Sequence, residues 1–430
     1  MTAEVVERVS SKEHLHDVKR EHGIGVVRAI IFITANVAGS GVLALPNAVS
    51  DAGGWLGIAL LLLLCVNAAY AGTHLGHCWG LLEKYCPELR GPVRNPYPTI
   101  GDRAYGTIAR RVVVVVMQLE ILGAGTVFLL LSSQMISGLL SPYTPNLGPC
   151  LWLLIVSALV CPAMWLGTPK DFWGFGVMAM LTTLVACTVS TVQSIIESST
   201  LPPPDTSFTL TTESFFLGFG TILFAFGGSA TFPTIQNDMR DRRRFPTSVA
   251  IAFVVILAMY LPVAISGFAV FGHGVESNIL DSLTQGPAVT VAEVMVATHL
   301  ITTFVIMTNP ATQYFEMLFH VPPKFGWKRC LLRTMVLLLM VFVGETIQDF
   351  GKVLALVGGS TSTLNNLVFP PLFYLRLTSK FEPHRPVPLF KRIYLYTILA
   401  MGVIGGLAAT YSALLDIFSP DSFRKPCYVP

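Results

Sequence analysis

Long apolar stretches recur along this 430-residue chain and constrain its fold more than any other feature. Hydrophobic residues make up 53% of the sequence and charged residues only 12%, and the mean hydropathy is +0.63. A helix needs roughly 20 apolar residues to cross a hydrocarbon core of about 30 Å. We therefore predict an all-α polytopic membrane protein with eleven transmembrane helices, at residues 26–49, 55–81, 112–140, 150–166, 172–196, 214–239, 247–271, 289–319, 330–343, 353–374 and 393–418.

The positions of the 28 Lys and Arg residues predict how these helices are oriented. Cytosolic loops retain basic residues, whereas translocated loops carry few. With the N-terminus in the cytosol, all fall on the cytosolic side except Lys352, Arg424 and Lys425. We therefore expect a cytosolic tail at 1–24, a membrane domain at 25–418 and a short extracellular or lumenal tail at 419–430. The membrane is expected to be the plasma membrane or an endolysosomal or vesicular one.

Two of the apolar stretches are interrupted at their middle by small residues. Gly39-Ser40-Gly41 lies in the first stretch and Gly227-Gly228-Ser229 in the sixth, and each triplet is soon followed by a proline, Pro46 or Pro233. Unpaired backbone groups are too costly to expose to lipid, so broken helices persist where they line a cavity. The matched breaks predict a binding site, although small residues also permit close helix packing.

The spacing of the breaks indicates an internal repeat. Five spans separate corresponding positions, and because five is odd the second copy is inverted in the membrane. We predict one repeat at about 26–196, a second at about 214–374 and an additional helix at about 393–418. Such inverted repeats are typical of secondary transporters.

Several motifs resemble those of the amino acid/auxin permease family. The segment 36–46 is similar to the first-helix signature of that family, and 226–236 is similar to its sixth-helix signature. Further similarities lie at 125–131, 309–316 and 369–374, so that the resemblance covers nearly the whole chain after about residue 24. It implies an amino acid transporter of the LeuT-type fold, coupled to protons or sodium.

A zwitterionic amino acid requires N–H donors for its carboxylate and carbonyl acceptors for its ammonium group. A broken helix offers both, with its positive dipole end directed at the carboxylate. We expect the N–H groups after Gly41 to bind the carboxylate and the carbonyls of 226–228 to bind the ammonium group of a substrate that is expected to be neutral. The candidate substrate-binding residues are Asn36, Ala38, Gly39, Ser40, Gly41, Phe226, Gly227, Gly228 and Ser229.

Glu120 is the candidate coupling residue because it lies inside the third apolar stretch. A carboxylate there costs roughly 2.5 to 3.5 kcal/mol on insertion scales, which favours a functional role such as reversible protonation. The alternative is that Glu120 lies near the inner surface and extends to water. These two interpretations stay open at this point.

Departures from the family pattern bear on the coupling ion. Sodium-coupled relatives carry an asparagine where this chain has Ala35, and many relatives carry a histidine where it has Ser229. We expect coupling to H⁺ rather than Na⁺. The alternatives are a sodium-coupled transporter, an uncoupled exchanger, or an amino-acid-sensing protein with little flux.

Other classes of function have less support in the sequence. It contains no nucleotide-binding loop and no catalytic motif with workable spacing, so we expect neither an enzyme nor a primary pump. We also expect no cofactor, no bound metal and no nucleic-acid partner; His74 and His77 share a helix face, but no third ligand lies nearby in sequence. A disulfide between Cys150 and Cys427 is left open, as is the oligomeric state.

Overall fold

The structure is a computed structural model that describes residues 23–91, 93, 95–166, 173–202, 209–322, 324–419 and 426–428. These residues form helices, with no strand among them beyond a single bridge between Ile24 and Met239. The predicted all-α class is therefore confirmed. Most of the expected cytosolic tail, at 1–22, and most of the expected C-terminal tail lie outside the described residues.

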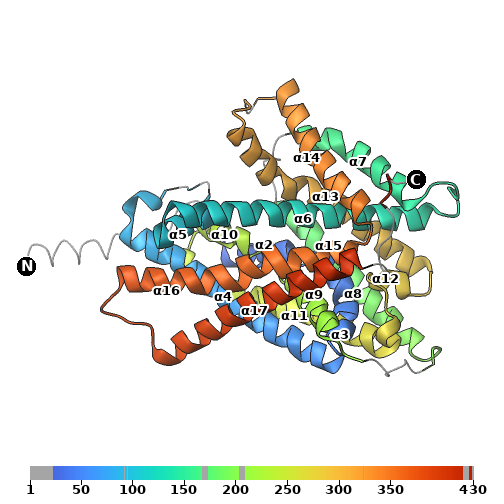
Figure 1. Cartoon of the computed structure of the whole chain (residues 1–430), viewed down its shortest axis with the longest axis horizontal. Coiled ribbons are helices and arrows are strands. Elements are labelled where there is room, and N and C mark those ends of the chain that lie inside the picture. Colours follow the sequence, from blue (N-terminus) through green and yellow to red (C-terminus); the bar gives the residue numbers. More distant parts are fainter. Residues whose placement is uncertain are drawn as a thin grey trace, which may run out of the picture.

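Many of the helices follow the long axis of the molecule, and α14 and α7 project to one side (Figure 1). The main α-helices are α2 (Val26–Val37), α3 (Leu45–Asp51), α4 (Trp55–Tyr85), α5 (Pro96–Tyr105), α6 (Thr107–Leu140), α7 (Pro149–Trp165), α8 (Trp173–Glu197), α9 (Thr212–Ala225), α10 (Phe232–Asp238), α11 (Phe245–Phe271), α12 (Ile279–Ser282), α13 (Pro287–Leu318), α14 (Trp327–Thr346), α15 (Phe350–Val357), α16 (Phe369–Phe381) and α17 (Leu389–Phe418).

Each predicted apolar stretch falls on helical segments, but fewer than eleven of these are long and apolar enough to count as spans. Among the described residues, seven helices are long and apolar enough to cross a membrane, and two bent pairs raise the number to nine. The pairs are Val26–Val37 with Ser40–Asp51, bent by 49°, and Trp327–Thr346 with Phe350–Phe381, bent by 114°. The shorter apolar helix α7 is additional. The expected count of eleven is therefore not confirmed.

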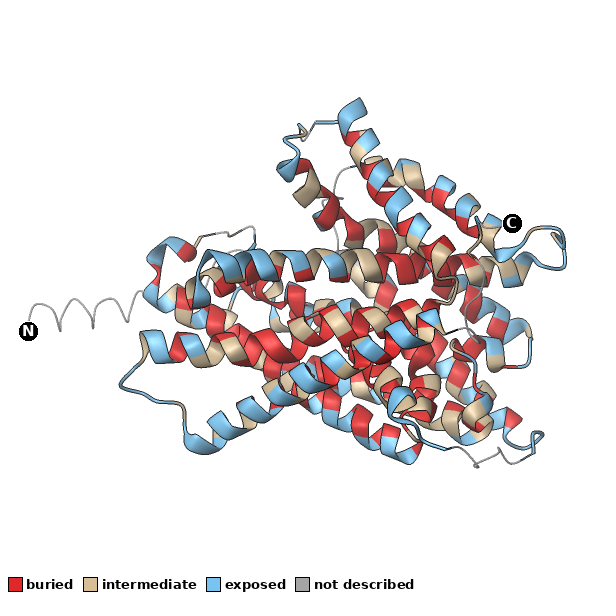
Figure 2. Cartoon of the chain, in the orientation of Figure 1, coloured by how far each residue is buried: buried red, intermediate tan, exposed pale blue. Residues whose placement is uncertain are grey.

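The buried surface lies where helices face one another, and much of the outer surface is apolar. Figure 2 shows buried residues gathered along the facing sides of the helices. Helix α6 packs along α13, and α11 packs against α4, α2 and α8. Large apolar side chains such as Leu338, Leu339 and Leu407 are exposed. An exposed apolar surface of this kind is what a bilayer solvates.

Two helices, α5 and the four-residue α12, lie outside the eleven predicted stretches. Residues 82–111, between the second and third stretches, contain several prolines, yet they include α5, which packs against α6. The prolines do not exclude a helix here, because Pro96 lies in the first turn of α5. A proline there sacrifices no intrahelical hydrogen bond and favours helix initiation.

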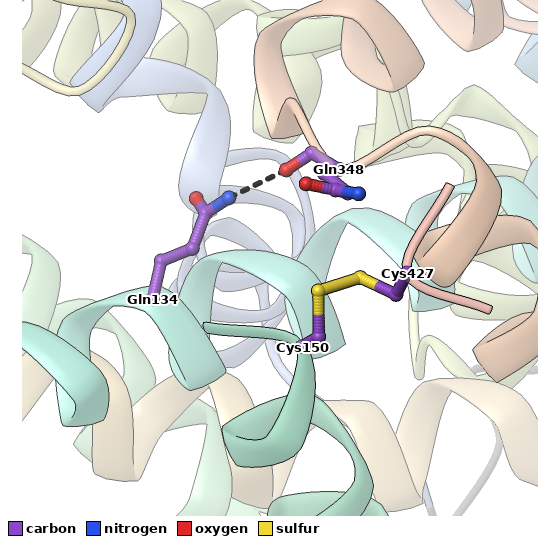
Figure 3. Close-up of a disulfide and its surroundings, with 4 residues drawn as sticks. All are labelled: Gln134, Cys150, Gln348 and Cys427. Carbon is purple, nitrogen blue, oxygen red and sulfur yellow. Dashed lines mark hydrogen bonds between the residues drawn. A yellow bond between two sulfur atoms is a disulfide. The ribbon is translucent and has the colours of Figure 1, made fainter. Parts of the chain in front are cut away.

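A disulfide joins Cys150 to Cys427, which resolves the pairing left open by the sequence (Figure 3). The Cys427 N–H also donates to the Glu345 carbonyl at 3.0 Å, and the Tyr428 ring stacks on Phe342. These contacts attach residues 426–428 to the start of α7 and the end of α14.

Candidate functional site

The first helix break separates α2 from α3. Helix α2 ends at Val37, a 3₁₀ turn η2 covers Ser40–Ala44, and α3 begins at Leu45 with Pro46 in its first turn. Gly39 lies between the two helical pieces. The predicted interruption of the first span is present, and it bends the span by 49°.

The second break separates α9 from α10. Helix α9 ends at Ala225, and Gly228 adopts a φ of +126°, which residues other than glycine rarely adopt. A 3₁₀ turn η4 at Ser229–Thr231 then leads into α10, which has Pro233 in its first turn. The glycine is thus required by the backbone conformation itself.

The two breaks face each other. The Asn36 side-chain amide donates to the Gly228 carbonyl at 3.0 Å. The hydroxyl oxygen of Tyr260, on α11, lies 3.1 Å from the carbonyl oxygens of both Val37 and Ala225. The structure therefore brings together both groups of predicted substrate-binding residues, which are nearly 200 positions apart in the sequence.

The steric constraints at the glycines of the two breaks differ. A β-carbon at Gly41 would lie 2.6 Å from the Cα of Ala225, so Gly41 permits close packing of the first break on α9. A β-carbon at Gly228 would lie 2.4 Å from the Asn36 side-chain nitrogen. At Gly39 it would meet only the ring of Phe128, at 3.4 Å. Close helix packing, the alternative raised above, thus explains Gly41 but not Gly39.

The remaining predicted residues differ in their surroundings. The Ala38 carbonyl accepts a bond from Thr183 of α8 at 3.1 Å, and the Phe226 ring is buried against Tyr260. The hydroxyl of Ser40 is buried and has no hydrogen-bond partner within the described part of the chain. A buried hydroxyl without a partner is costly, so Ser40 has bonding capacity available for a ligand.

Glu120 lies deep in the bundle. Its side chain is buried and accepts a bond of 2.5 Å from the side-chain amide of Asn365. A β-carbon at Gly227 would lie 3.6 Å from its other carboxylate oxygen. The alternative that Glu120 extends to water at the membrane surface is therefore wrong, because its carboxylate contacts the tenth apolar stretch beside the second break.

Asn365 and Asn366 are site residues that the sequence analysis missed. They lie in η8 (Leu364–Val368), which follows η7 (Gly358–Ser362), and both segments are π-helical. The Asn365 carbonyl accepts bonds from the hydroxyls of Ser229 and Tyr97, and the Asn366 side chain accepts from the Ser229 N–H. Two adjacent amides in an apolar stretch are a detectable signal, because polar residues inside membranes are commonly functional.

One side of the second break remains open to solvent. Asn36 and Thr231 both donate to the Gly228 carbonyl, yet both are exposed. Thr234 and Asp238 continue the exposed face along α10. Helix α10 packs against α2 and α4, and α2 packs against α11 and α8, but neither α2 nor α10 packs extensively on α6 or α13. The break is therefore accessible from the end of the molecule at which α2 begins.

Comparison with known proteins identifies the family. A family model described as transmembrane amino acid transporter protein matches residues 22–415. The Arabidopsis thaliana amino acid transporter AVT1J is 25% identical over 423 residues, with 96% of each chain covered. The Arabidopsis thaliana amino acid transporter AVT3B is 26% identical, with 91% of this chain and 92% of the relative covered. These relatives are transporters rather than enzymes.

Solved structures share the fold. The crystal structure of MhsT in complex with L-phenylalanine has a TM-score of 0.58 at 14% identity and covers 92% of this chain and 100% of that one. The Eremococcus coleocola manganese transporter has a TM-score of 0.59 at 12% identity, covering 95% and 92%. These likenesses support the LeuT-type fold expected from the motifs. With a family match over nearly its whole length, the chain belongs to the transmembrane amino acid transporter family.

Proposed function

We propose that the chain is a proton-coupled secondary transporter that binds a neutral amino acid between its two helix breaks. The observation that carries the proposal is the direct contact of the breaks, at Asn36 and the Gly228 carbonyl. Secondary transporters bind substrates near the membrane midplane at discontinuous helices, where backbone groups are free to bond. Membership of the family supports an amino acid as the substrate.

The backbone at the breaks suits a zwitterion. The first N–H groups of η2, which begins at Ser40, have no partner within that helical turn and lie at a positive dipole end, so they suit the carboxylate. The ammonium group would be bound by carbonyls near Gly228, whose own carbonyl accepts from the exposed side chains of Asn36 and Thr231. The hydroxyl of Ser40 supplies one further group for the substrate.

Glu120 supports the proton coupling. Its carboxylate bonds Asn365 and lies beside Gly227 of the second break, where an added β-carbon would lie 3.6 Å from it. Protonation of Glu120 would remove the negative charge to which the Asn365 side-chain amide donates. The backbone carbonyl of Asn365 in turn accepts a bond from the Ser229 hydroxyl of the second break. The charge on Glu120 would thus alter contacts that hold the second break against η8.

The contacts of α2 and α10 support movement of the two helices as one unit. Ile24 exchanges backbone bonds of 2.9 Å with Asp238 and Arg240, which ties the start of α2 to the end of α10. Arg242, just beyond α10, forms an ion pair with Glu83 of α4. Rocking of such a unit against α6 and α13 would close the solvent-accessible side and open the other, as alternating access requires.

The orientation is part of the proposal. The basic residues favour a cytosolic N-terminus. The disulfide between Cys150 and Cys427 independently favours an extracellular or lumenal C-terminus, because disulfides persist in oxidising compartments. The accessible side would then face the cytosol.

The proposal is tested by transport in proteoliposomes with Glu120→Gln. One charge moving through roughly 100 mV contributes about 2.3 kcal/mol, which supports some forty-fold accumulation in the wild type. Glutamine keeps the shape but cannot release a proton, so accumulation should be lost while exchange of internal for external amino acid continues. Glu293→Gln is the matched control, because Glu293 is another buried carboxyl in a span and accepts a bond from Gln285, away from both helix breaks in the sequence. Accumulation that survives in Glu120→Gln would contradict the coupling role, and loss of exchange as well would indicate a structural carboxylate.

A further inference from the structure

We propose that the hydroxyl of Tyr260 occupies the position between the two helix breaks at which a metal cation would otherwise bind. The chain therefore needs no sodium ion at the position between the two breaks. The inference rests on the proposed function for its meaning in transport, but the geometry that carries it is separate from the substrate and from Glu120.

The ends of two helices converge on this one side chain. Val37 is the last residue of α2 and Ala225 is the last residue of α9, and both carbonyl oxygens lie 3.1 Å from the Tyr260 hydroxyl oxygen. Tyr260 is fully buried and comes from a third helix, α11. The hydroxyl therefore reaches the two breaks from outside both broken spans.

Such a place is suited to a cation. The last carbonyls of a helix lack partners within it, and they lie at the negative end of the helix dipole. Hard cations prefer oxygen ligands, and in transporters the free carbonyls and half-helix ends near broken helices coordinate the coupling ion. Without an occupant, the Val37 carbonyl would keep the bond from the Gly39 N–H, but the Ala225 carbonyl would lose the donor that Tyr260 gives it.

Tyr260 satisfies this requirement with a neutral donor. Its single O–H can donate to either carbonyl, and the Gly39 N–H also donates to the Val37 carbonyl at 2.9 Å. The ring is held by the Phe226 ring, with centroids 5.6 Å apart. Because the phenol oxygen already lies between the two carbonyl oxygens, an ion cannot bind there without displacing the ring.

Truncating the ring should therefore create sodium binding. Tyr260→Ser and Tyr260→Asn each leave an oxygen ligand and space for a cation with its waters beside the two carbonyls. We expect the thermal unfolding midpoint of either purified full-length variant to rise by roughly 2 °C or more when choline chloride is replaced by sodium chloride. The wild type should show no such shift. No amino acid is added, so the outcome does not depend on whether the chain transports.

Two control variants separate this effect from general cavity formation. Tyr97→Ser opens a comparable cavity at another buried tyrosine, but the Tyr97 hydroxyl bonds a single carbonyl, that of Asn365, so no sodium response is expected. Tyr260→Phe removes only the hydroxyl and leaves no room for an ion. It should lower the midpoint equally in both salts.

Three results would overturn the inference. The first is a sodium-dependent shift in the wild type as large as in Tyr260→Ser. The second is a folded Tyr260→Ser or Tyr260→Asn without any sodium response. The third is an equal response in Tyr97→Ser. A variant that is recovered folded only when purified in sodium would support the inference. Where neither truncated variant folds, Tyr260→Phe serves as the second test, and a midpoint of Tyr260→Phe that rises in sodium chloride would overturn the inference.

Discussion

Gly228→Ala should weaken amino acid binding far more than Gly39→Ala, although both change one glycine of a helix break. Gly228 has a φ of +126°, and a β-carbon there would lie 2.4 Å from the Asn36 side chain. An unfavourable backbone conformation costs about 1 to 3 kcal/mol, and loss of the Asn36 hydrogen bond costs about 0.5 to 1.5 kcal/mol. Where binding requires the conformation described here, the sum of about 1.5 to 4.5 kcal/mol corresponds to roughly 10-fold to 2,000-fold in affinity.

Gly39→Ala is the matched control because its β-carbon would approach only the Phe128 ring, at 3.4 Å. Equilibrium binding of a labelled amino acid to each purified variant measures the effect, and size-exclusion chromatography checks that both are folded. Leucine at either position should abolish binding, since the larger side chain fills the space between the breaks. Equal affinities for Gly228→Ala and Gly39→Ala would refute the reasoning.

Three further predictions concern the serines, the disulfide and the orientation. Ser229→Ala should lower the thermal midpoint, because it loses the bond to the Asn365 carbonyl, worth about 0.5 to 1.5 kcal/mol. Ser40→Ala should not lower the midpoint, because it removes a buried hydroxyl that has no partner among the described residues, but it should weaken substrate binding; an equal loss of stability in both variants would contradict this. Cys427→Ser and Cys150→Ser should lower the thermal midpoint by the same amount, with no addition in the double variant, because either change removes the same crosslink; additive losses would argue against the bond. A cysteine at Thr209 should react with a membrane-impermeant reagent in intact cells and one at Arg243 only after permeabilisation; the reverse would invert the proposed topology.

The sequence predicted the helix breaks because glycine and proline act locally. The conformation of Gly228 and the placement of Pro46 and Pro233 in first helical turns follow directly from those residue types. The helical class followed equally from apolar length. These features depend on near neighbours in the chain, which periodicity and residue type describe well.

Contacts between distant segments could not be predicted in the same way. Glu120 was identified as the candidate coupling residue, with its burial left open, and its partner Asn365 lies 245 positions away. The position of Asn365 depends on π-helical turns that have no sequence signature. The close approach of Gly41 to Ala225 and the position of the Tyr260 hydroxyl likewise depend on how the two halves pack. Helix α5 was missed because its prolines resemble loop residues.

Substrate protection of a single cysteine tests most directly the central claim that an amino acid binds between the breaks. Thr231→Cys introduces an exposed thiol beside the Gly228 carbonyl, in a background that lacks the six free cysteines. A transported amino acid should slow its reaction with a maleimide, with half-maximal protection at the concentration that half-saturates uptake, while Thr209→Cys reacts at an unchanged rate. An unchanged rate for Thr231→Cys at saturating amino acid, in a variant that still transports, would contradict the account.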